Sequence, residues 1–324
     1  MSLLDLQDVV IELPRSGSLT RVIDGVNLTV EEGEILGVCG ESGSGKSVTM
    51  MSLLGLLPRH TRICGSAKFD GVDLYRLSPK ELRKLAGRRI GMIFQDPMST
   101  LHPMLSIGTQ MTDHVRRHLG VDRREASRLA ASLLDEVRIH DPYDALRSYP
   151  HQFSGGMRQR ISLATALVCE PRLLVADEPT TALDVTVQAS ILRLLAKIRE
   201  DRGIGIVLIS HDLGVSSALA DRLVVFYAGS IMESGPSSEV LQRPRHPYTA
   251  ALLGALPRHS GPGEAPSSSM AAIPGSLPSP EGRPTGCVFH PRCSYTQAAC
   301  TERRPELVEV DQRSFACPVD PFRG

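Results

Sequence analysis

The stretch that decides the fold is Gly40-Glu41-Ser42-Gly43-Ser44-Gly45-Lys46-Ser47. Its spacing is G-x-x-x-x-G-K-[ST], in which glycines let backbone N–H groups turn inward around phosphate oxygens. An apolar run, Ile35–Cys39, precedes it, and a helical pattern follows over Ser47–Leu57 until Pro58. This context predicts a nucleotide site in which Lys46 contacts the β- and γ-phosphates and Ser47 ligates Mg²⁺. A Gly/Ser-rich surface turn is the alternative, and it leaves the flanking strand and helix unexplained.

The composition of the chain excludes several classes of protein. With 324 residues and 41% hydrophobic content, it can form one large domain, alone or with a small appendage. Lys+Arg and Asp+Glu both number 36 and only 4% of residues are aromatic, so we expect no nucleic-acid partner. No apolar run reaches the roughly 18 residues of a membrane span, and the N-terminus lacks a secretion signal. We therefore expect the protein in the cytoplasm or on the cytoplasmic face of a membrane.

The hydrophobic pattern changes once along the chain. Residues 1–34 alternate apolar and polar positions, which is typical of half-buried antiparallel strands. Short apolar runs then alternate with helical patterns, of which Val185–Arg199 is the clearest. These runs are Ile35–Cys39, Ile90–Phe94, Leu173–Ala176 and Ile204–Ile209. Buried strands that alternate with helices predict an α/β fold with a mostly parallel sheet.

The same pattern predicts the domain organisation. Residues 111–150 are charged with helical spacing and predict a helical insertion, within a helical subdomain of roughly 98–160. The nucleotide-binding domain is expected to span 1–256. Residues 257–284 are rich in Pro, Gly and Ser and predict a linker. A cysteine-containing extension, 285–324, follows it.

Two acids follow one of the buried runs. The run Leu173–Ala176 is followed by Asp177 and Glu178. An aspartate at the end of a strand beside the phosphate loop would hold Mg²⁺ and its water shell. Glu178 is then placed to orient or deprotonate the attacking water. By itself, the pattern is also that of a strand reaching solvent, but the phosphate loop favours the catalytic interpretation.

Further segments resemble those of the ABC ATPase family. Residues 153–160 read Phe-Ser-Gly-Gly-Met-Arg-Gln-Arg and resemble the signature sequence shortly before the acidic pair. Gln95 resembles the Q-loop glutamine and His211 the switch histidine, each after a buried run. Ala182-Leu183-Asp184 resembles the loop that crosses the dimer interface. The order and spacing of these motifs carry the resemblance over roughly residues 1–257.

The resemblance implies a mechanism that uses two subunits and two ATP molecules. It implies an ABC-type nucleotide-binding domain, with an N-terminal antiparallel β subdomain and a helical insertion. Two such domains close head to tail around the nucleotides. Ser154, Gly155 and Gly156 are expected to face the γ-phosphate on the partner. The residues that act on this chain's own nucleotide are then Lys46, Ser47, Gln95, Asp177, Glu178 and His211, with Mg²⁺ held by Ser47, Gln95 and Asp177.

Four stretches resemble the ATPases of dipeptide and oligopeptide importers in particular. They are Gln95-Asp96-Pro97-Met98, the signature segment 153–160, His246-Pro247-Tyr248-Thr249 and Gly286-Cys287-Val288-Phe289-His290-Pro291-Arg292-Cys293. The resemblance implies two permeases, an extracytoplasmic substrate-binding protein and a peripheral position at the cytoplasmic face of the inner membrane. Met157 is typical of one of two paired ATPase subunits, which implies a heterodimer.

The sequence is also compatible with other functions. Importers of nickel, opines or glutathione use closely similar ATPases, because the ATPase does not touch the cargo. A soluble ABC ATPase of DNA repair or translation is a second alternative, although the chain has neither sustained heptads nor a second cassette. A small-molecule kinase would share the phosphate loop, but it leaves Ser154–Met157 and His211 without a role.

Four of the seven cysteines lie in the last 40 residues. Cys287, Cys293, Cys300 and Cys317 are separated by five, six and sixteen residues, which does not fit C-x₂-C zinc spacing. Four thiolates from a Pro-rich segment favour an iron–sulfur cluster, and the resemblance implies a [4Fe–4S] cluster. Zinc, disulfides and free thiols are the alternatives.

The usual aromatic partner of adenine is missing upstream of the phosphate loop. Family members stack the base on an aromatic residue there, whereas no aromatic residue precedes Phe69 in this chain. Arg15 or Arg21 is the expected substitute, since a guanidinium can stack on the base.

Overall fold

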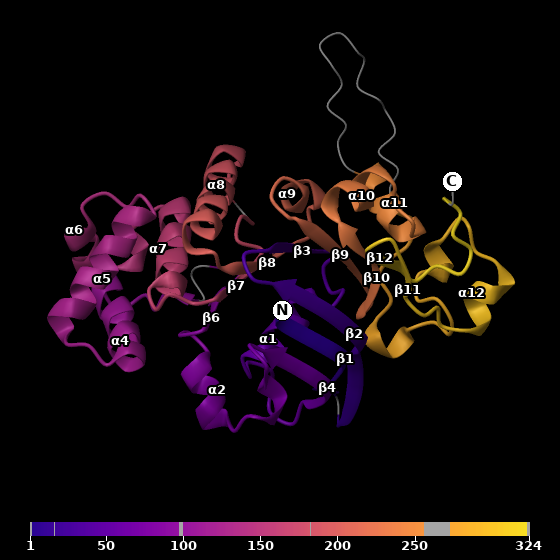
Figure 1. Cartoon of the computed structure of the whole chain (residues 1–324), viewed down its shortest axis with the longest axis horizontal. Coiled ribbons are helices and arrows are strands. Elements are labelled where there is room, and N and C mark those ends of the chain that lie inside the picture. Colours follow the sequence, from indigo (N-terminus) through magenta and orange to yellow (C-terminus); the bar gives the residue numbers. More distant parts are fainter. Residues whose placement is uncertain (1, 16, 97–99, 182, 256–272, 323–324) are drawn as a thin grey trace, which may run out of the picture. The chain divides into compact units, whose positions relative to one another are not determined.

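The computed structural model describes residues 2–15, 17–96, 100–181, 183–255 and 273–322 (Figure 1). These residues form two compact units. The first unit contains Val30–Ile35 and Phe69–Ile209, together with the start of the chain. The second unit contains Asp5–Thr29, Leu36–Lys68 and the chain from Ser210 onward.

The first unit contains three parallel strands. β6 (Ile90–Ile93) pairs with β7 (Leu173–Asp177), and β7 pairs with β8 (Gly205–Ser210). All residues of β7 and β8 are buried, as expected for the central strands of a parallel sheet covered on both faces. The short apolar runs therefore form the predicted parallel strands.

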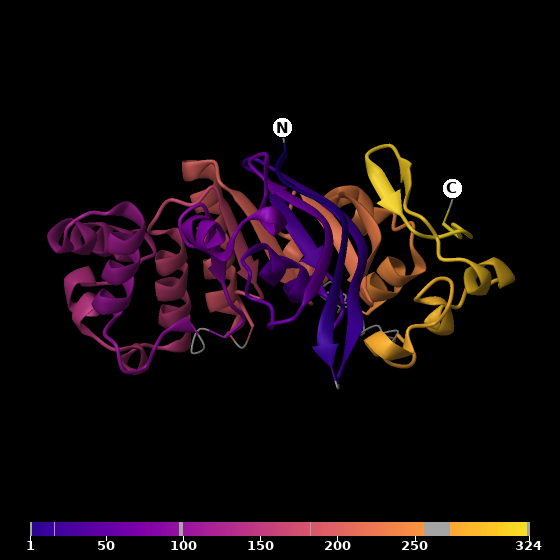
Figure 2. The ribbon, with the colours of Figure 1, turned by 90° about the horizontal axis from the view of Figure 1, so that it is seen from below.

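Helices make up most of the remainder of this unit. Helices α4, α5 and α6 pack on one another, and α4 and α5 also pack on α7 (Figure 2). Ala126, Ala130 and Leu134 of α5 are fully buried, so the charged side chains of the insertion lie on the outer face. Among the described helices, none has the length and apolarity needed to cross a membrane. The bounds are α2 Pro79–Leu85, α4 Ile107–Leu119, α5 Arg123–Glu136, α6 Pro142–Arg147, α7 Gly155–Leu167 and α8 Val185–Arg202.

The second unit begins with two long strands. β1 (Ser2–Arg15) lies between β2 (Ser18–Glu31) and β4 (Arg62–Phe69) in one sheet. Only two residues connect β1 to β2, and a connection this short joins antiparallel strands. The alternating pattern of residues 1–34 is thus explained by a hairpin.

A mixed sheet carries the phosphate-binding loop and the C-terminal extension. β3 (Ile35–Cys39) pairs in parallel with β9 (Arg222–Tyr227), and β9 pairs antiparallel with β10 (Ser230–Pro236). The extension adds β12 (Arg313–Phe315) to β10 and β11 (Val308–Val310) to β12, both antiparallel. The helices of this unit are α1 Lys46–Leu53, α9 Leu213–Ser217, α10 Ser237–Gln242, α11 Pro247–Gly254 and α12 Ala298–Glu302.

Two helix ends differ from their predicted positions. Helix α1 ends at Leu53 rather than Leu57, because Gly55 turns the chain with a φ of 66°. Helix α8 runs three residues past Arg199 and ends at Arg202, where Gly203 adopts a φ of 62°. In both cases a glycine beyond the helix, rather than the end of the apolar pattern, sets the boundary.

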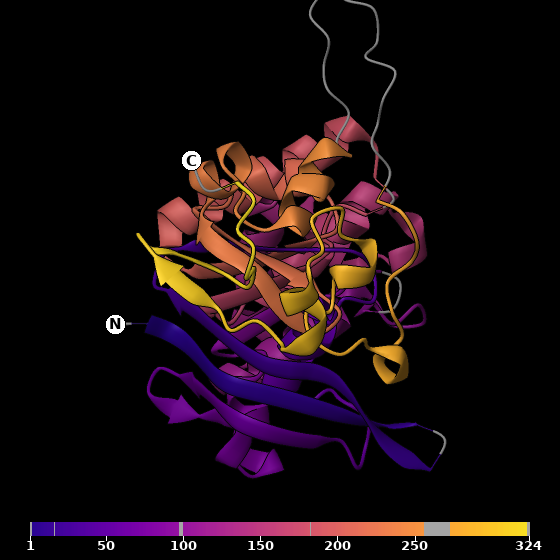
Figure 3. The same cartoon turned by 90° about the vertical axis from the view of Figure 1, so that its right-hand side faces the viewer.

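A buried carboxylate fastens the extension to β10. Glu233 is fully buried and accepts a hydrogen bond from Arg313 at 2.7 Å. It also accepts the backbone N–H groups of Arg245 and His246 at 2.9 and 3.0 Å. Since a buried charge is stable only when paired and hydrogen-bonded, these contacts hold β12 and the start of α11 against β10 (Figure 3).

The sequence-based domain boundaries fall partly outside the described residues. The linker predicted at 257–284 is described only from residue 273 onward. Its end contains one short 3₁₀ helix, Pro280–Gly282. The boundaries of the predicted domains therefore stay predictions.

Candidate functional site

The phosphate-binding loop has the backbone that its glycines permit. It joins β3 to α1, and Gly40, Gly43 and Gly45 have φ values of 145°, 81° and 107°. Residues with a side chain rarely adopt such angles. A Cβ on Gly40 would also lie 2.1 Å from the backbone carbonyl oxygen of Phe226, so packing excludes a side chain there as well.

The ammonium group of Lys46 is held by its own loop. It donates to the carbonyl oxygens of Gly40 at 2.7 Å and Glu41 at 2.9 Å, and to the Ser44 hydroxyl at 3.3 Å. Lys46 is only 5% exposed. Ser47 follows it in the first turn of α1, where the helix N-terminus favours an anion. In the second unit, the phosphate-binding loop thus holds the Lys46 ammonium in place and leads directly into the N-terminus of α1.

The first unit brings Gln95 and Glu178 together. Gln95 donates through Nε2 to the Glu178 carboxylate at 2.8 Å. Asp177 is the last residue of β7, and Glu178 follows with a φ of 45° that turns the chain at the strand end. The hydroxyl of Thr181 donates to the same Glu178 oxygen at 2.9 Å. Thr181 was not predicted, and only its position three residues after Glu178 offered a signal.

The signature residues form the start of α7. Ser154 caps this helix, since its hydroxyl accepts the N–H of Met157 at 3.4 Å, and Gly155 and Gly156 are the first helical residues. Ser154 and Gly155 are exposed. A Cβ on Gly156 would lie 2.7 Å from Val187, so a glycine is needed there. An exposed, capped helix N-terminus can bind an anion from another molecule.

The remaining predicted residues lie next to β8 and α8 or fall outside the described residues. His211 directly follows β8, is exposed and belongs to the second unit. Leu183 and Asp184 precede α8, which Asp184 caps, while Ala182 lies outside the described residues. Pro97 and Met98 of the Q-loop stretch are outside them too.

Two family models match consecutive parts of this chain. The ABC transporter model matches residues 23–181, and the model of the oligopeptide/dipeptide transporter C-terminal region matches residues 232–300. The chain is 40% identical to a dipeptide transport ATP-binding protein of Escherichia coli, over 99% of this chain and 98% of that protein. The chain belongs to the ABC transporter ATPase family.

Further relatives extend the similarity over nearly the full length. A putative peptide import ATP-binding protein of Brucella abortus is 44% identical over 98% of this chain and 94% of that protein. An oligopeptide transport ATP-binding protein of Salmonella typhimurium is 42% identical with the same coverage. A dimeric ATP-binding cassette in a post-hydrolysis state, bound to ADP and Pi, matches with a TM-score of 0.65 and 26% identity, covering 72% of this chain and 98% of that one. This ABC-type ATPase therefore binds and hydrolyses ATP, as its loop predicts.

The four late thiols of this ABC ATPase are neighbours. Cys287, Cys300 and Cys317 are buried, Cys293 is half-buried, and the Cys287 N–H donates to the Cys300 carbonyl at 2.8 Å. Burial, with a smaller contribution from charge repulsion by the other three thiols, raises the pKa of Cys287 to about 11. The donor chemistry suits an iron–sulfur cluster. Among the described residues, however, no group of three or more His, Cys, Asp or Glu side chains is arranged to hold a metal ion.

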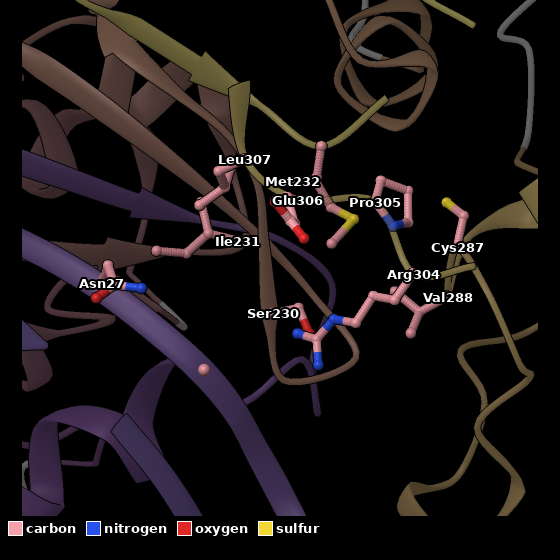
Figure 4. Close-up of a pocket in the computed structure, with 12 residues that line it drawn as sticks. Asn27, Ser230, Ile231, Met232, Cys287, Val288, Arg304, Pro305, Glu306 and Leu307 are labelled. Atoms are coloured by element: carbon pink, nitrogen blue, oxygen red, sulfur yellow. The ribbon is translucent and has the colours of Figure 1, made fainter. Parts of the chain in front are cut away.

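A separate cavity adjoins the extension. Its volume is about 460 Å³, and it lies between residues of β2, β10 and the tail (Figure 4). The Arg304 guanidinium points toward Ser230 and donates to its hydroxyl at 2.9 Å. Cys287 is the one predicted site residue that lines this cavity. The cavity is therefore distinct from the phosphate-binding loop.

Both arginines that were expected to cover adenine are paired with carboxylates. Arg15 contacts Glu281 at 3.5 Å, and Arg21 contacts Asp24 at 3.1 Å. Arg15 and Glu281 are both about half exposed, so the pair lies at the surface. Contact of either arginine with the base stays a prediction.

The histidine of the His246-Pro247-Tyr248-Thr249 stretch caps a helix. His246 is 1% exposed, and its Nδ1 accepts the N–H of Tyr248 at 3.0 Å at the start of α11. Burial lowers the pKa of His246 to about 3. The folded protein therefore holds this histidine in its neutral form.

A pH-dependent loss of stability follows from this burial. Between pH values of about 6.5 and 3, the unfolded chain binds a proton on His246 that the folded chain does not. The free energy of unfolding should therefore fall as the pH falls through this range. His246→Asn keeps an oxygen that can cap the helix and removes the group that titrates. The free energy of unfolding of this variant should therefore fall less steeply with falling pH, by up to ~1.4 kcal/mol per pH unit between about pH 6 and 4.

Urea unfolding at several pH values measures this effect. The exposed His140 offers the matched control, and His140→Asn should keep the wild-type dependence. An unchanged pH dependence in His246→Asn would contradict the prediction.

Proposed function

We propose that this chain is the ATP-hydrolysing subunit of an importer that moves dipeptides or oligopeptides across the inner membrane from its cytoplasmic face. The observation that carries this proposal is the match of residues 232–300 to the C-terminal region of oligopeptide and dipeptide transporters. The names of the full-length relatives point to the same cargo. Nickel, opines or glutathione remain alternative cargoes, because the ATPase does not contact the cargo.

The loop and the two acids act on the nucleotide bound by this chain. Lys46 and the loop N–H groups bind the phosphates, where the positive charge offsets that of the anion. Ser47, Asp177 and Gln95 offer the hydroxyl and carbonyl-type oxygens that Mg²⁺ prefers, and the ion when bound would neutralise phosphate charge. His211 would act on the γ-phosphate of the same nucleotide. This assignment is supported by the burial of Lys46 and by the position of Asp177 at the end of β7.

Glu178 is the catalytic base, and its contacts support this role. Gln95 and Thr181 both donate to one carboxylate oxygen, Oε2. These hydrogen bonds orient the carboxylate, which in this assignment orders or deprotonates the attacking water. In this assignment Gln95 both senses the nucleotide and positions the base.

A second, homologous ATPase subunit completes the site. Ser154, Gly155 and Gly156 would bind the γ-phosphate held by that subunit, and the exposure of Ser154 and Gly155 at this helix N-terminus supports the role. Met157 supports a heterodimer rather than two identical chains. ATP binding would then close the two subunits, and hydrolysis would release them.

The first unit offers a surface for the two permeases. A cavity of about 690 Å³ is lined by residues of α4, α5 and α6 and by Tyr149. Met104 and Leu105, in the segment that follows Gln95, are 77% and 42% exposed. Exposed apolar side chains beside a cavity favour a protein partner, here a permease helix. An extracytoplasmic substrate-binding protein would complete the importer.

The cysteine tail would hold a [4Fe–4S] cluster through Cys287, Cys293, Cys300 and Cys317. The mutual proximity of the four thiols supports this assignment. The cluster, when bound, would cross-link the extension. Zinc and free thiols are the alternatives, and in this structure the described side chains form no arrangement of three or more His, Cys, Asp or Glu residues that could hold a metal ion.

The role of Glu178 predicts a variant that binds ATP without hydrolysing it. Glu178→Gln should lower turnover by more than about a hundredfold, because a general base contributes roughly 10²- to 10⁴-fold. ATP binding should persist. Steady-state phosphate release and binding of a fluorescent ATP analogue measure the two effects. The exposed Glu200 gives the control, and Glu200→Gln should hydrolyse ATP normally. Near-normal turnover in Glu178→Gln would disprove the assignment.

The cluster predicts iron in the purified protein. After anaerobic purification, iron and acid-labile sulfide should each approach about four per chain. Cys300→Ser should lose most of both, whereas Cys64→Ser should keep them, because Cys64 is exposed and lies outside the tail. Stoichiometric zinc without iron would refute the cluster.

The proposed partners predict what accompanies the tagged chain. Affinity purification from detergent-solubilised membranes, followed by mass spectrometry, should recover two permeases and a second ATPase. A peptide-binding protein associated with them would identify the cargo. Recovery from the soluble fraction alone, with ribosomal or DNA-repair proteins, would contradict a transporter.

A further inference from the structure

The second residue of the phosphate-binding loop is bonded to the C-terminal extension. Arg292 donates through one terminal nitrogen to both carboxylate oxygens of Glu41, at 2.9 and 3.1 Å. The Arg292 side chain is 7% exposed and that of Glu41 is 28% exposed. An ion pair shielded in this way is stronger and less screened by salt than one on the surface.

The Arg292 guanidinium is itself held from several sides. Its Nε donates to the Pro274 carbonyl at 2.7 Å, and a terminal nitrogen donates to the Tyr227 hydroxyl at 3.3 Å. It also lies over the Tyr227 ring, 5.7 Å from the ring centre. Phe289 packs edge-on against Tyr227 three residues before Arg292. The charge that faces Glu41 is therefore fixed in position rather than mobile.

The backbone of Glu41 is connected to the chemistry of the loop. Its N–H donates to the Tyr248 hydroxyl at 3.0 Å, and its carbonyl accepts from Lys46 at 2.9 Å. Displacing Glu41 would therefore move an oxygen that positions the Lys46 ammonium. The Leu277 side chain also lies near the loop, since a Cβ placed on Gly43 would be 3.4 Å from one of its methyl groups.

We propose that the C-terminal extension holds the phosphate-binding loop in its nucleotide-binding conformation, with Arg292 as the positioning residue that acts through Glu41. The proposal rests on the nucleotide role assigned above to Lys46 and the loop. Three glycines at positive φ make the loop costly to order. Anchoring Glu41 lowers this cost before ATP arrives, so the extension contributes to affinity without touching the nucleotide.

The role of the Arg292–Glu41 ion pair can be tested with three variants of this chain, each purified together with the subunits that accompany it. Arg292→Gln, Glu41→Gln and the double variant should each raise the KM for ATP and the Kd for MgADP by about tenfold, with little change in kcat. The double variant should resemble the single ones, because all three remove one shared contact. Arg292→Lys should recover part of the affinity, since it keeps the charge but not the planar fork.

A matched control separates this effect from general loosening of the tail. Asp320 pairs with Arg245 and also fastens the extension, and neither residue takes part in the contacts of Glu41 and Arg292 described above. Asp320→Asn should keep the wild-type KM. Thermal unfolding establishes that each variant is folded, and Glu41→Gln tests the pair even if Arg292→Gln does not fold.

Three outcomes would decide the matter. Wild-type KM and Kd values in folded Arg292→Gln and Glu41→Gln would overturn the proposal. An equal rise in Asp320→Asn would overturn it too, because the effect would then not depend on Glu41. If Lys46→Ala bound MgADP as tightly as the wild type, the nucleotide assignment itself would fail, and the positioning role would fail with it.

Discussion

The ammonium of Lys46 lies buried against the carbonyl oxygens of Gly40 and Glu41. A buried cation is stable only where fixed dipoles or anions surround it, so this charge determines the path of the loop around it. The positive φ angles of the glycines direct these carbonyls toward the ammonium and permit the turn from β3 into α1. The parallel pairing of β3 with β9 then fixes where the loop begins. The nucleotide site depends on this arrangement.

Much of the fold could be predicted because its signals are local. The short apolar run Ile35–Cys39 is typical of a buried strand. The spacing of Gly40, Gly45 and Lys46 is that of a phosphate-binding loop between a strand and a helix. The helices of the insertion could likewise be predicted from the helical spacing of their residues. Helix ends were predicted less well, since Gly55 and Gly203 terminate α1 and α8 through a backbone angle that the apolar pattern does not report.

The contacts that support the site could not be predicted from local patterns. Arg292 and Glu41 are 251 positions apart, and Tyr248 and Glu41 are 207 apart. No spacing rule connects such residues, because their proximity results from how β9, β10 and the extension pack. Thr181 is a milder case. It lies close to Glu178 in sequence, but only the turn after β7 shows that its hydroxyl reaches the carboxylate.

The stretch from Cys287 to Cys293 combines three structural roles. It contributes two of the neighbouring thiols, the ring of Phe289 that packs on Tyr227 and Tyr248, and the guanidinium that binds Glu41. Because Arg292 directly precedes Cys293, a change at the thiols that moves the backbone there also moves the partner of the loop. The cysteine tail and the phosphate-binding loop are thus joined through Arg292 and Glu41.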